Sequence, residues 1–336
     1  MNLAASVLTG DRLAISRLLS QVENDTPEGR LALSELFAHT GRAHLIGVTG
    51  APGTGKSSLV NQLARYYRHP KAGENPRRVA IVAVDPSSPF SGGAILGDRI
   101  RMRDLAGDSG VFIRSMASRG SLGGLASATA SVVQVFDAAG FEVIMVETVG
   151  AGQAEVDIAR LAHTTLVVEA PGLGDEIQAI KAGILEIADV LVVNKADQPG
   201  VENTERALRS MLDLAHPTPR IFRHHGKAEA IPDPAGSPAQ PLWITPIQRT
   251  VSTEGTGIPE VAEHIARHRA YLQTTGDWQR REHARIQNEL ETLLRETLVA
   301  RWRQSTGDDA YQQVLDSLYD RKISPHQAVE KLLASE

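Results

Sequence analysis

Residues 50–57 form a glycine-rich loop that is typical of one kind of α/β fold. They read GAPGTGKS, after the apolar segment 45–49 and before a stretch, 57–65, whose apolar residues recur at helical spacing. Strand, glycine loop and helix in this order are the context in which such a loop binds nucleotide phosphates. Glycine permits backbone angles closed to other residues, so successive N–H groups can converge on phosphate oxygens beside the helix N-terminus. The sequence therefore predicts a nucleotide site.

Each residue of this loop has an expected role. The Lys56 ammonium is expected to reach the β- and γ-phosphates, and the Ser57 hydroxyl to bind Mg²⁺. The predicted phosphate-binding residues are Gly50, Ala51, Pro52, Gly53, Thr54, Gly55, Lys56, Ser57 and Ser58.

A second motif indicates which base the nucleotide carries. Asn194-Lys195-Ala196-Asp197 follows the apolar run 189–193, which places it on the loop after a strand, at the edge where open α/β sheets bind ligands. The Asp197 carboxylate can accept from guanine N1–H and the exocyclic amine together, a contact that adenine cannot make. Asn194 is expected to brace the loop and the Lys195 stem to lie along the base. The predicted nucleotide is GTP or GDP.

Carboxylates between the two motifs are candidates for hydrolysis. Asp85 ends the apolar run 79–84, where a carboxylate can bind Mg²⁺ directly or through water. Asp98 begins a helical stretch and is a second candidate, with a favourable charge at a helix N-terminus as the alternative. Glu147 follows another apolar run and stands where GTPases keep an Asp-x-x-Gly loop. Gln153, a little further on, is a weaker candidate for orienting water.

The chain is expected to fall into three parts: a helical segment at 1–40, a nucleotide-binding domain at 41–270 and a helical arm at 271–336. Strands alternating with helices predict a mostly parallel, doubly wound sheet in the central part. Thr26 is a candidate N-cap followed by Pro27, and Ser324 by Pro325. The predicted strands are 44–49, 79–84, 111–115, 142–147, 164–170, 189–194 and 242–247, and the Pro-rich segment 216–241 is expected to be a surface excursion.

The arm carries an apolar stripe, which is expected either to pack within the chain or to form a dimer seam. Its members are Ile286, Leu290, Leu293, Leu294 and Leu298. The net charge of −5 argues against binding nucleic acid or an anionic membrane, and the absence of cysteine excludes disulfides and thiolate metal sites. No run approaches about 18 consecutive apolar residues. A cytoplasmic location is expected.

Longer stretches resemble the MeaB/MMAA family, formerly annotated ArgK, whose members are GTPase chaperones of adenosylcobalamin-dependent acyl-CoA mutases. Residues 84–102 (VDPSSPFSGGAILGDRIRM) carry the strongest similarity. Further matching stretches are 115–124, 147–153 and 171–186, and the resemblance covers nearly the whole chain. It implies a P-loop GTPase that gates delivery of adenosylcobalamin to a partner mutase, and protects or reactivates that mutase. It also implies a homodimer formed through the C-terminal helices.

The resemblance also implies residue roles. Lys56, Asp98 and Glu147 would be catalytic, and Ser57, Asp85, Asp98 and Glu147 would surround Mg²⁺. The stretches Asp85–Asp104 and Glu147–Val156 would act as switches, and Gly172–Lys181 as a third switch toward the mutase. Its key residues would be Gly174, Asp175 and Lys181.

Two stretches depart from the family pattern. The loop near the guanine O6 is usually of a Ser-Ala-Leu type, whereas residues 251–258 here read VSTEGTGI. A backbone N–H can make that contact whatever the side chain, so Ser252 and Thr253 are retained as nucleotide-binding candidates. The loop at 68–78 is longer than expected and is interpreted as a solvated surface.

Three alternatives remain open at this stage. A nickel-insertion GTPase would need a metal-handling His/Cys cluster, and the chain offers no cysteine and a lone His224-His225 pair. A small-molecule kinase would place adenine where Asp197 points. A scaffold would lack GTP turnover. The client mutase is not identified by the sequence.

Overall fold

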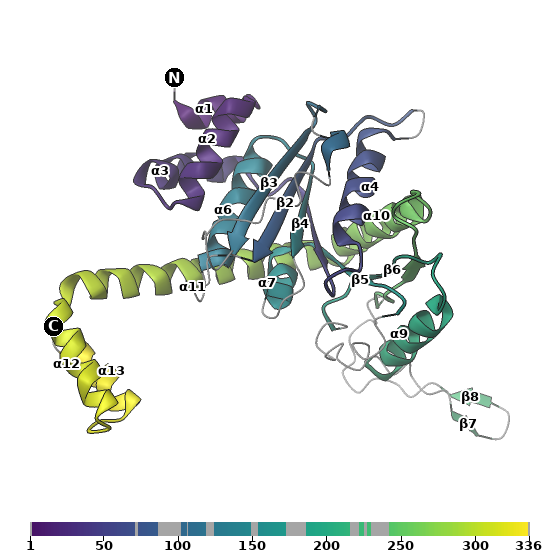
Figure 1. Cartoon of the computed structure of the whole chain (residues 1–336). Coiled ribbons are helices and arrows are strands. Elements are labelled where there is room, and N and C mark those ends of the chain that lie inside the picture. The colour runs from purple at the N-terminus through teal and green to yellow at the C-terminus, as the bar shows by residue number, and fades with distance from the viewer. Residues whose placement is uncertain are drawn as a thin grey trace. The chain divides into compact units, whose positions relative to one another are not determined.

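A seven-stranded parallel sheet forms the centre of the protein (Figure 1). The computed structural model describes residues 2–70, 73–86, 102–105, 107–118, 124–148, 154–172, 186–215, 222–224, 227–229 and 242–334. The sheet order is β3-β2-β4-β1-β5-β6-β9, and each neighbouring pair is parallel. The strands are β1 (His44–Thr49), β2 (Val79–Pro86), β3 (Val111–Ser118), β4 (Val143–Thr148), β5 (Thr164–Glu169), β6 (Val190–Val193) and β9 (Ile247–Arg249).

Helices cover both faces of this sheet, as the alternation of strands and helices predicted. They are α1 (Leu3–Leu8), α2 (Arg12–Glu23), α3 (Pro27–Leu36), α4 (Lys56–Arg68), α6 (Gly124–Ala138), α7 (Ala154–Leu161), α9 (Val201–Ala215) and α10 (Ile258–Thr275). Short 3₁₀ turns lie at Phe37–His39 and Arg103–Leu105. Thr26 caps α3 through a hydrogen bond from Gly29 N, and Pro27 is the first helical residue.

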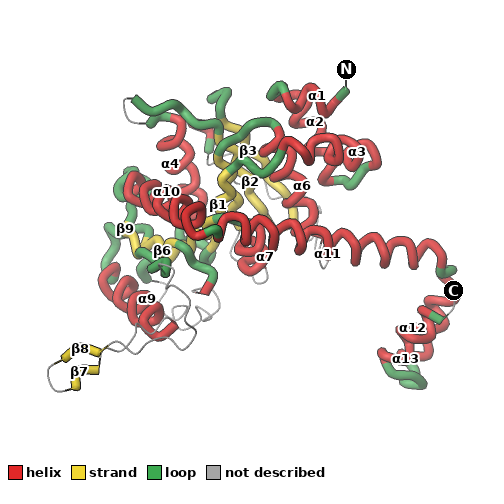
Figure 2. The backbone as a smooth tube through the Cα atoms, turned by 180° about the vertical axis from the view of Figure 1, so that it is seen from behind, coloured by secondary structure: helices red, strands yellow, loops and turns green. Residues whose placement is uncertain are grey.

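Successive side chains of a strand point to opposite faces of the sheet, so alternate residues pack against different helices. In β2, Val79 and Ile81 join one buried cluster with residues of α4 and α10. Ala80, Val82 and Val84 face the other way, into a cluster with α1–α3 and α6. The N-terminal helices therefore share a core with the sheet. Figure 2 shows α9 beside β6, where Val201 and Leu208 pack against Leu191 and Val193.

One predicted strand was wrong in its position. The segment 242–247 was expected to be a strand, but β9 begins at Ile247 and continues to Arg249. Pro246 has no N–H to donate to a ladder, and its carbonyl accepts from Leu191 N (2.9 Å) just before the parallel pairing starts. Within the expected excursion 216–241, residues 222–224 and 227–229 form a short antiparallel pair, β7 (Phe222–His224) and β8 (Lys227–Glu229).

The chain divides into two compact units, Met1–Arg285 and Ile286–Glu336. The long helix α11 (Asp277–Ser305) begins after Gly276, which ends α10 with a φ of 77°. In the second unit, α12 (Asp308–Tyr319) and α13 (Pro325–Leu333) contribute the buried Val314 and Ala328. Ser324 caps α13 in a complete capping box. Within the described ranges, no helix is long and apolar enough to cross a membrane.

Buried polar groups fasten α10 and the start of α11 to the sheet within the first unit. Arg281 donates two hydrogen bonds of 2.8 Å to Asp189, which comes just before β6. His163 Nε2 lies 3.1 Å from Glu282 Oε2, and Arg285 also donates to Glu282. Burial alone would raise the pKa of Glu282, but these two partners outweigh it and lower the pKa to about 2. The pKa of Asp189 is likewise about 2.

The lowered pKa values of Glu282 and Asp189 make the stability of the fold depend on pH in the acidic range. A carboxylate with a lowered folded-state pKa stabilises the protein above its unfolded pKa, and the gain is lost as the pH falls toward the folded value. A drop from about 4 to about 2 corresponds to roughly 2–3 kcal/mol. We expect the free energy of unfolding to fall progressively from about pH 5 to about pH 2. Urea titrations at several pH values measure it.

Two substitutions serve as comparisons for that measurement. Glu282→Gln should reduce the pH dependence, since only Asp189 of the two carboxylates still titrates. Asp213→Asn, at an exposed position on α9, should leave it unchanged. An identical slope in Glu282→Gln and the wild type would contradict the account.

Candidate functional site

The predicted phosphate loop connects the end of β1 to the start of α4. Gly50, Gly53 and Gly55 all have positive φ, of 136°, 82° and 92°. A Cβ at Gly50 would lie 2.1 Å from the Val168 carbonyl oxygen, and one at Gly55 would lie 2.3 Å from Asn194 Nδ2. Glycine is therefore required at both positions by conformation and by space. Helix α4 begins at Lys56 without a side-chain cap, which leaves its first N–H groups directed into the loop.

The lysine and serine at the start of α4 are held in place. The buried Lys56 ammonium donates to the carbonyls of Gly50 and Ala51, both at 2.9 Å. The Ser57 hydroxyl donates to Glu147 Oε1 at 2.7 Å. Glu147 lies near the end of β4 and is 5% exposed, so its carboxylate is held close to the loop within a largely buried environment. The structure thus brings together three of the predicted residues.

Asn194 ties the predicted base loop to the phosphate loop. Its Nδ2 donates to the Thr54 carbonyl at 2.8 Å. Its Oδ1 accepts from the Thr250 hydroxyl (3.0 Å), from Ser252 N (3.1 Å) and from the Ser252 hydroxyl (2.8 Å). Asn194 is 2% exposed, and all four contacts are buried. One side chain therefore sets the relative position of three loops at this sheet edge.

The rest of the predicted base site lies beside this bracing residue. Lys195 has a φ of 55°, a rare angle for a residue with a side chain. Asp197 is exposed, and within the described part of the chain its carboxylate accepts no hydrogen bond, so it can receive a ligand donor. Ser252 and Thr253 lie in a turn closed by pairing between Val251 and Thr256, with Ser252 buried and Thr253 exposed.

Several predicted residues cannot be compared with the structure. Asp85 belongs to β2, where its backbone is in register with Ala117, but its side chain lies outside the described part. Asp98, Gln153 and the third-switch residues Gly174, Asp175 and Lys181 lie outside the described residues. Among the residues that are described, no group of three or more His, Cys, Asp or Glu side chains could hold a metal ion.

Two threonine contacts at this edge were not anticipated. The Thr148 hydroxyl donates to the Thr49 hydroxyl at 3.0 Å, which links the residue after Glu147 to the residue before Gly50. Thr250 joins the Asn194 contacts from the residue after β9. The sequence offered one signal for these contacts, which is that all three threonines lie at or next to the carboxyl end of a strand. A buried hydroxyl there needs a partner, but sequence does not say which.

The sequence matches one protein family over residues 15–307, described as "Methylmalonyl Co-A mutase-associated GTPase MeaB". A putative GTPase of Pyrococcus abyssi is 40% identical over 324 residues, covering 96% of this chain and 93% of that protein. GTPase ArgK of Escherichia coli is 30% identical over 331 residues, covering 96% and 92%. The crystal structure of a LAO/AO transport system kinase matches 99% of this chain over 95% of its own length, with a TM-score of 0.67. At 24% identity, this match establishes the fold alone.

Proposed function

The chain belongs to the MeaB family of methylmalonyl Co-A mutase-associated GTPases and is itself a GTPase, and from this we propose that it is the GTP-dependent chaperone of an adenosylcobalamin-dependent acyl-CoA mutase. In this proposal the chain gates the delivery of adenosylcobalamin to the mutase. It also protects or reactivates the mutase, and it does both through GTP binding and hydrolysis. The match to a mutase-associated family over residues 15–307 is the observation that carries it.

In this proposal the guanine nucleotide lies along the edge formed by the three bridged loops. Residues 50–58 surround the phosphates with backbone N–H groups, and Lys56 supplies a positive charge that follows the β–γ bridge. Lys195 and Asp197 contact the base, with Ser252 and Thr253 nearby. Support comes from the Asn194 contacts, which join the phosphate loop to both base loops at 2.8–3.1 Å.

The residues at the start of α4 fit a magnesium ion bound with the nucleotide. Mg²⁺ is bound in nucleotide sites by one or two protein oxygens together with phosphates and waters. The Ser57 hydroxyl and the Glu147 carboxylate supply hard oxygen donors 2.7 Å apart, and Asp85 and Asp98 are the further candidates. When bound, the ion would neutralise charge that develops on the phosphates.

Hydrolysis then requires two contributions from this chain. Lys56 stabilises negative charge on the phosphates through its ammonium, and the loop N–H groups add fixed dipoles. Glu147 orients the groups around the γ-phosphate, because β4 and the Thr148–Thr49 bond hold its backbone beside the loop. Asp98 is proposed as a second carboxylate of this kind. Gly174, Asp175 and Lys181 are proposed to contact the mutase and to order the catalytic loops.

We also propose a cytoplasmic homodimer formed through the C-terminal helices. The apolar stripe of α11 supports this, because it has no buried residue in the single chain. Its members are 38–64% exposed: Ile286, Leu290, Leu293, Leu294 and Leu298. Apolar side chains aligned along one helix in this way are typical of a contact surface. Light scattering on the full chain should give the mass of two chains, and the mass of one chain would remove the dimer from the proposal.

The chaperone role is tested by the lifetime of the mutase. Methylmalonyl-CoA mutase loaded with adenosylcobalamin is followed during turnover, alone and with the chain and GTP. We expect the mutase to stay active for longer with the chain and GTP, because the chain limits or reverses inactivation. The Lys56→Ala variant with GTP should give no protection. Equal decay in all samples would contradict the chaperone role while leaving GTP hydrolysis standing.

A further inference from the structure

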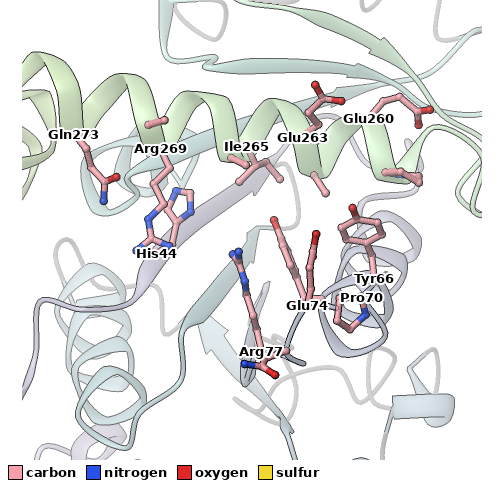
Figure 3. Close-up of a pocket in the computed structure, with 16 residues that line it drawn as sticks. His44, Tyr66, Pro70, Glu74, Arg77, Glu260, Glu263, Ile265, Arg269 and Gln273 are labelled. Carbon is pink, nitrogen blue, oxygen red and sulfur yellow. The ribbon is translucent and has the colours of Figure 1, made fainter. Parts of the chain in front are cut away.

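A groove of about 620 Å³ lies at the edge of the first unit opposite the nucleotide site (Figure 3). It is bounded by α10 on one side and by the end of α4 and the segment leading to β2 on the other. His44, the first residue of β1, contributes to its wall, whereas the phosphate loop follows the last residue of β1. Parallel strands put these two places at opposite edges of the sheet. The groove is therefore separate from the site already described.

Two arginines face this groove at one end. Arg77 lies before β2, with its Cζ 5.6 Å from the centroid of the Tyr67 ring. Arg269 is half-buried on α10, with its Cζ 5.5 Å from the centroid of the Trp278 ring. Figure 3 shows the Arg77 side chain directed into the groove toward α10. The pKa of Arg269 is lowered, first by burial and next by the charge of Arg77, as expected for two cations in one partly desolvated space.

Neither guanidinium forms an ion pair within the part of the chain that the structure describes. Arginines nearby behave differently: Arg68 makes two hydrogen bonds of 2.8 Å to Asp108, and Arg281 makes two to Asp189. His44 supplies no charge of either sign, because burial lowers its pKa well below the usual value and its Nε2 bonds to Thr164. The charge of Glu142 acts in the opposite sense on the pKa of Arg269, but its effect is smaller than those of burial and of Arg77. An oxyanion between the two guanidinium groups would relieve the remaining repulsion.

The other end of the groove is acidic. Glu260 and Glu263 lie on α10, and Glu74 faces them from the segment after α4. Glu260 and Arg269 are nine positions apart on one helix, which is about 13 Å at 1.5 Å per residue. The acidic and basic residues of α10 are therefore separated along the groove. The half-buried Tyr66 lies on the α4 side of the groove, across from Glu260 (Figure 3).

We propose that this groove is a second ligand site, which binds a small molecule carrying a phosphate or carboxylate group between Arg77 and Arg269. Arginine suits such a ligand because its planar fork donates to oxyanions in pairs. The groove volume lies within the range of small-molecule sites, about 300–1,000 Å³. The rest of the molecule would extend along the groove toward Tyr66, where a hydrogen-bond donor or amine at its far end would face the glutamates.

Calorimetric titration of the full chain tests the proposal, with inorganic phosphate and succinate as the two probes. The chain is first saturated with a non-hydrolysable GTP analogue and Mg²⁺, so that the γ-phosphate position is filled. We expect saturable binding of at least one probe. Arg269→Gln and Arg77→Gln should each weaken it about tenfold or more, since each removes one charged donor pair. Arg267→Gln, at an exposed position on the same helix, should leave it unchanged.

The outcomes separate cleanly. Tighter binding of phosphate assigns the ligand to the organic phosphates, and tighter binding of succinate assigns it to the carboxylates. No saturable binding of either probe would overturn the proposal. Binding that is equal in the wild type, Arg77→Gln and Arg269→Gln would overturn it too, because the probe would then lie elsewhere. If Arg269→Gln lowers the melting temperature, Arg77→Gln decides, because the Arg77 side chain is exposed.

Discussion

Replacing Lys56 with alanine is expected to reduce GTP turnover by roughly two to three orders of magnitude, the loss seen when one preorganised donor to a developing charge is removed. The Lys56 ammonium is buried beside the phosphate loop, held by the Gly50 and Ala51 carbonyls at 2.9 Å. In the proposed site it follows the charge on the β–γ bridge. Phosphate release from GTP under saturating nucleotide measures the loss.

Glu147→Ala is compared with Lys56→Ala to separate an effect on hydrolysis from an effect on nucleotide binding. Glu147 accepts a hydrogen bond from the Ser57 hydroxyl, and its proposed role lies around the metal and the attacking water, so its removal should slow hydrolysis about tenfold or more while GDP binding stays largely intact. Lys56→Ala should weaken nucleotide binding as well as turnover. Lys322→Ala, which changes an exposed lysine paired with Asp320, serves as the control. Wild-type turnover in Glu147→Ala would show that the loop after β4 has been misassigned.

Replacing Asp197 with asparagine is expected to change which base the protein selects. Loss of a paired, charge-assisted contact to guanine should cost on the order of 2–4 kcal/mol, which is roughly 30- to 1,000-fold in GDP affinity. Xanthosine diphosphate has an oxygen where guanine has the amine, so the asparagine amide should bind it better than the carboxylate does. Competition between the two diphosphates, in the wild type and in Asp197→Asn, measures this change in base selectivity.

An exposed carboxylate on α9 provides the control for this substitution. Asp213→Asn removes a carboxylate from an exposed position on α9 and should leave the affinity for both nucleotides unchanged. Asn194→Ala is a poor substitute for Asp197→Asn, because it also breaks the buried contacts to Thr54 and Ser252. GDP affinity that is the same in Asp197→Asn and the wild type would remove Asp197 from the base pocket.

Local patterns predicted most of the sheet because each strand is a short apolar run bounded by turn residues. The strands beginning at His44, Val79 and Val111 were predicted to the residue at their starts. Prediction failed at 242–247, where an apolar run contains a proline that cannot donate to the ladder.

In the candidate site, residues within a motif could be predicted, whereas contacts between distant motifs could not. Lys56, Ser57 and Asn194 could be predicted as site residues because their motifs are continuous in sequence. The proximity of Ser57 to Glu147 joins residues 90 positions apart, and that of Asn194 to Thr54 joins residues 140 apart. Such contacts depend on strand order and register, which one sequence does not specify. The two arginines of the groove were likewise hidden, because their segments looked like an ordinary solvated loop and an ordinary helix.

GTP turnover with and without a saturating acyl-CoA mutase tests the central claim most directly. Phosphate release is measured for the chain alone, with methylmalonyl-CoA mutase, and with the mutase and the Lys181→Ala or Asp175→Ala variant, using ATP as the nucleotide control. The account predicts slow release from GTP alone, none from ATP, and stimulation by the mutase of about tenfold or more, equivalent to ~1.4 kcal/mol of barrier. Both variants should lose part of that stimulation. A GTP rate that the mutase leaves unchanged would contradict the account.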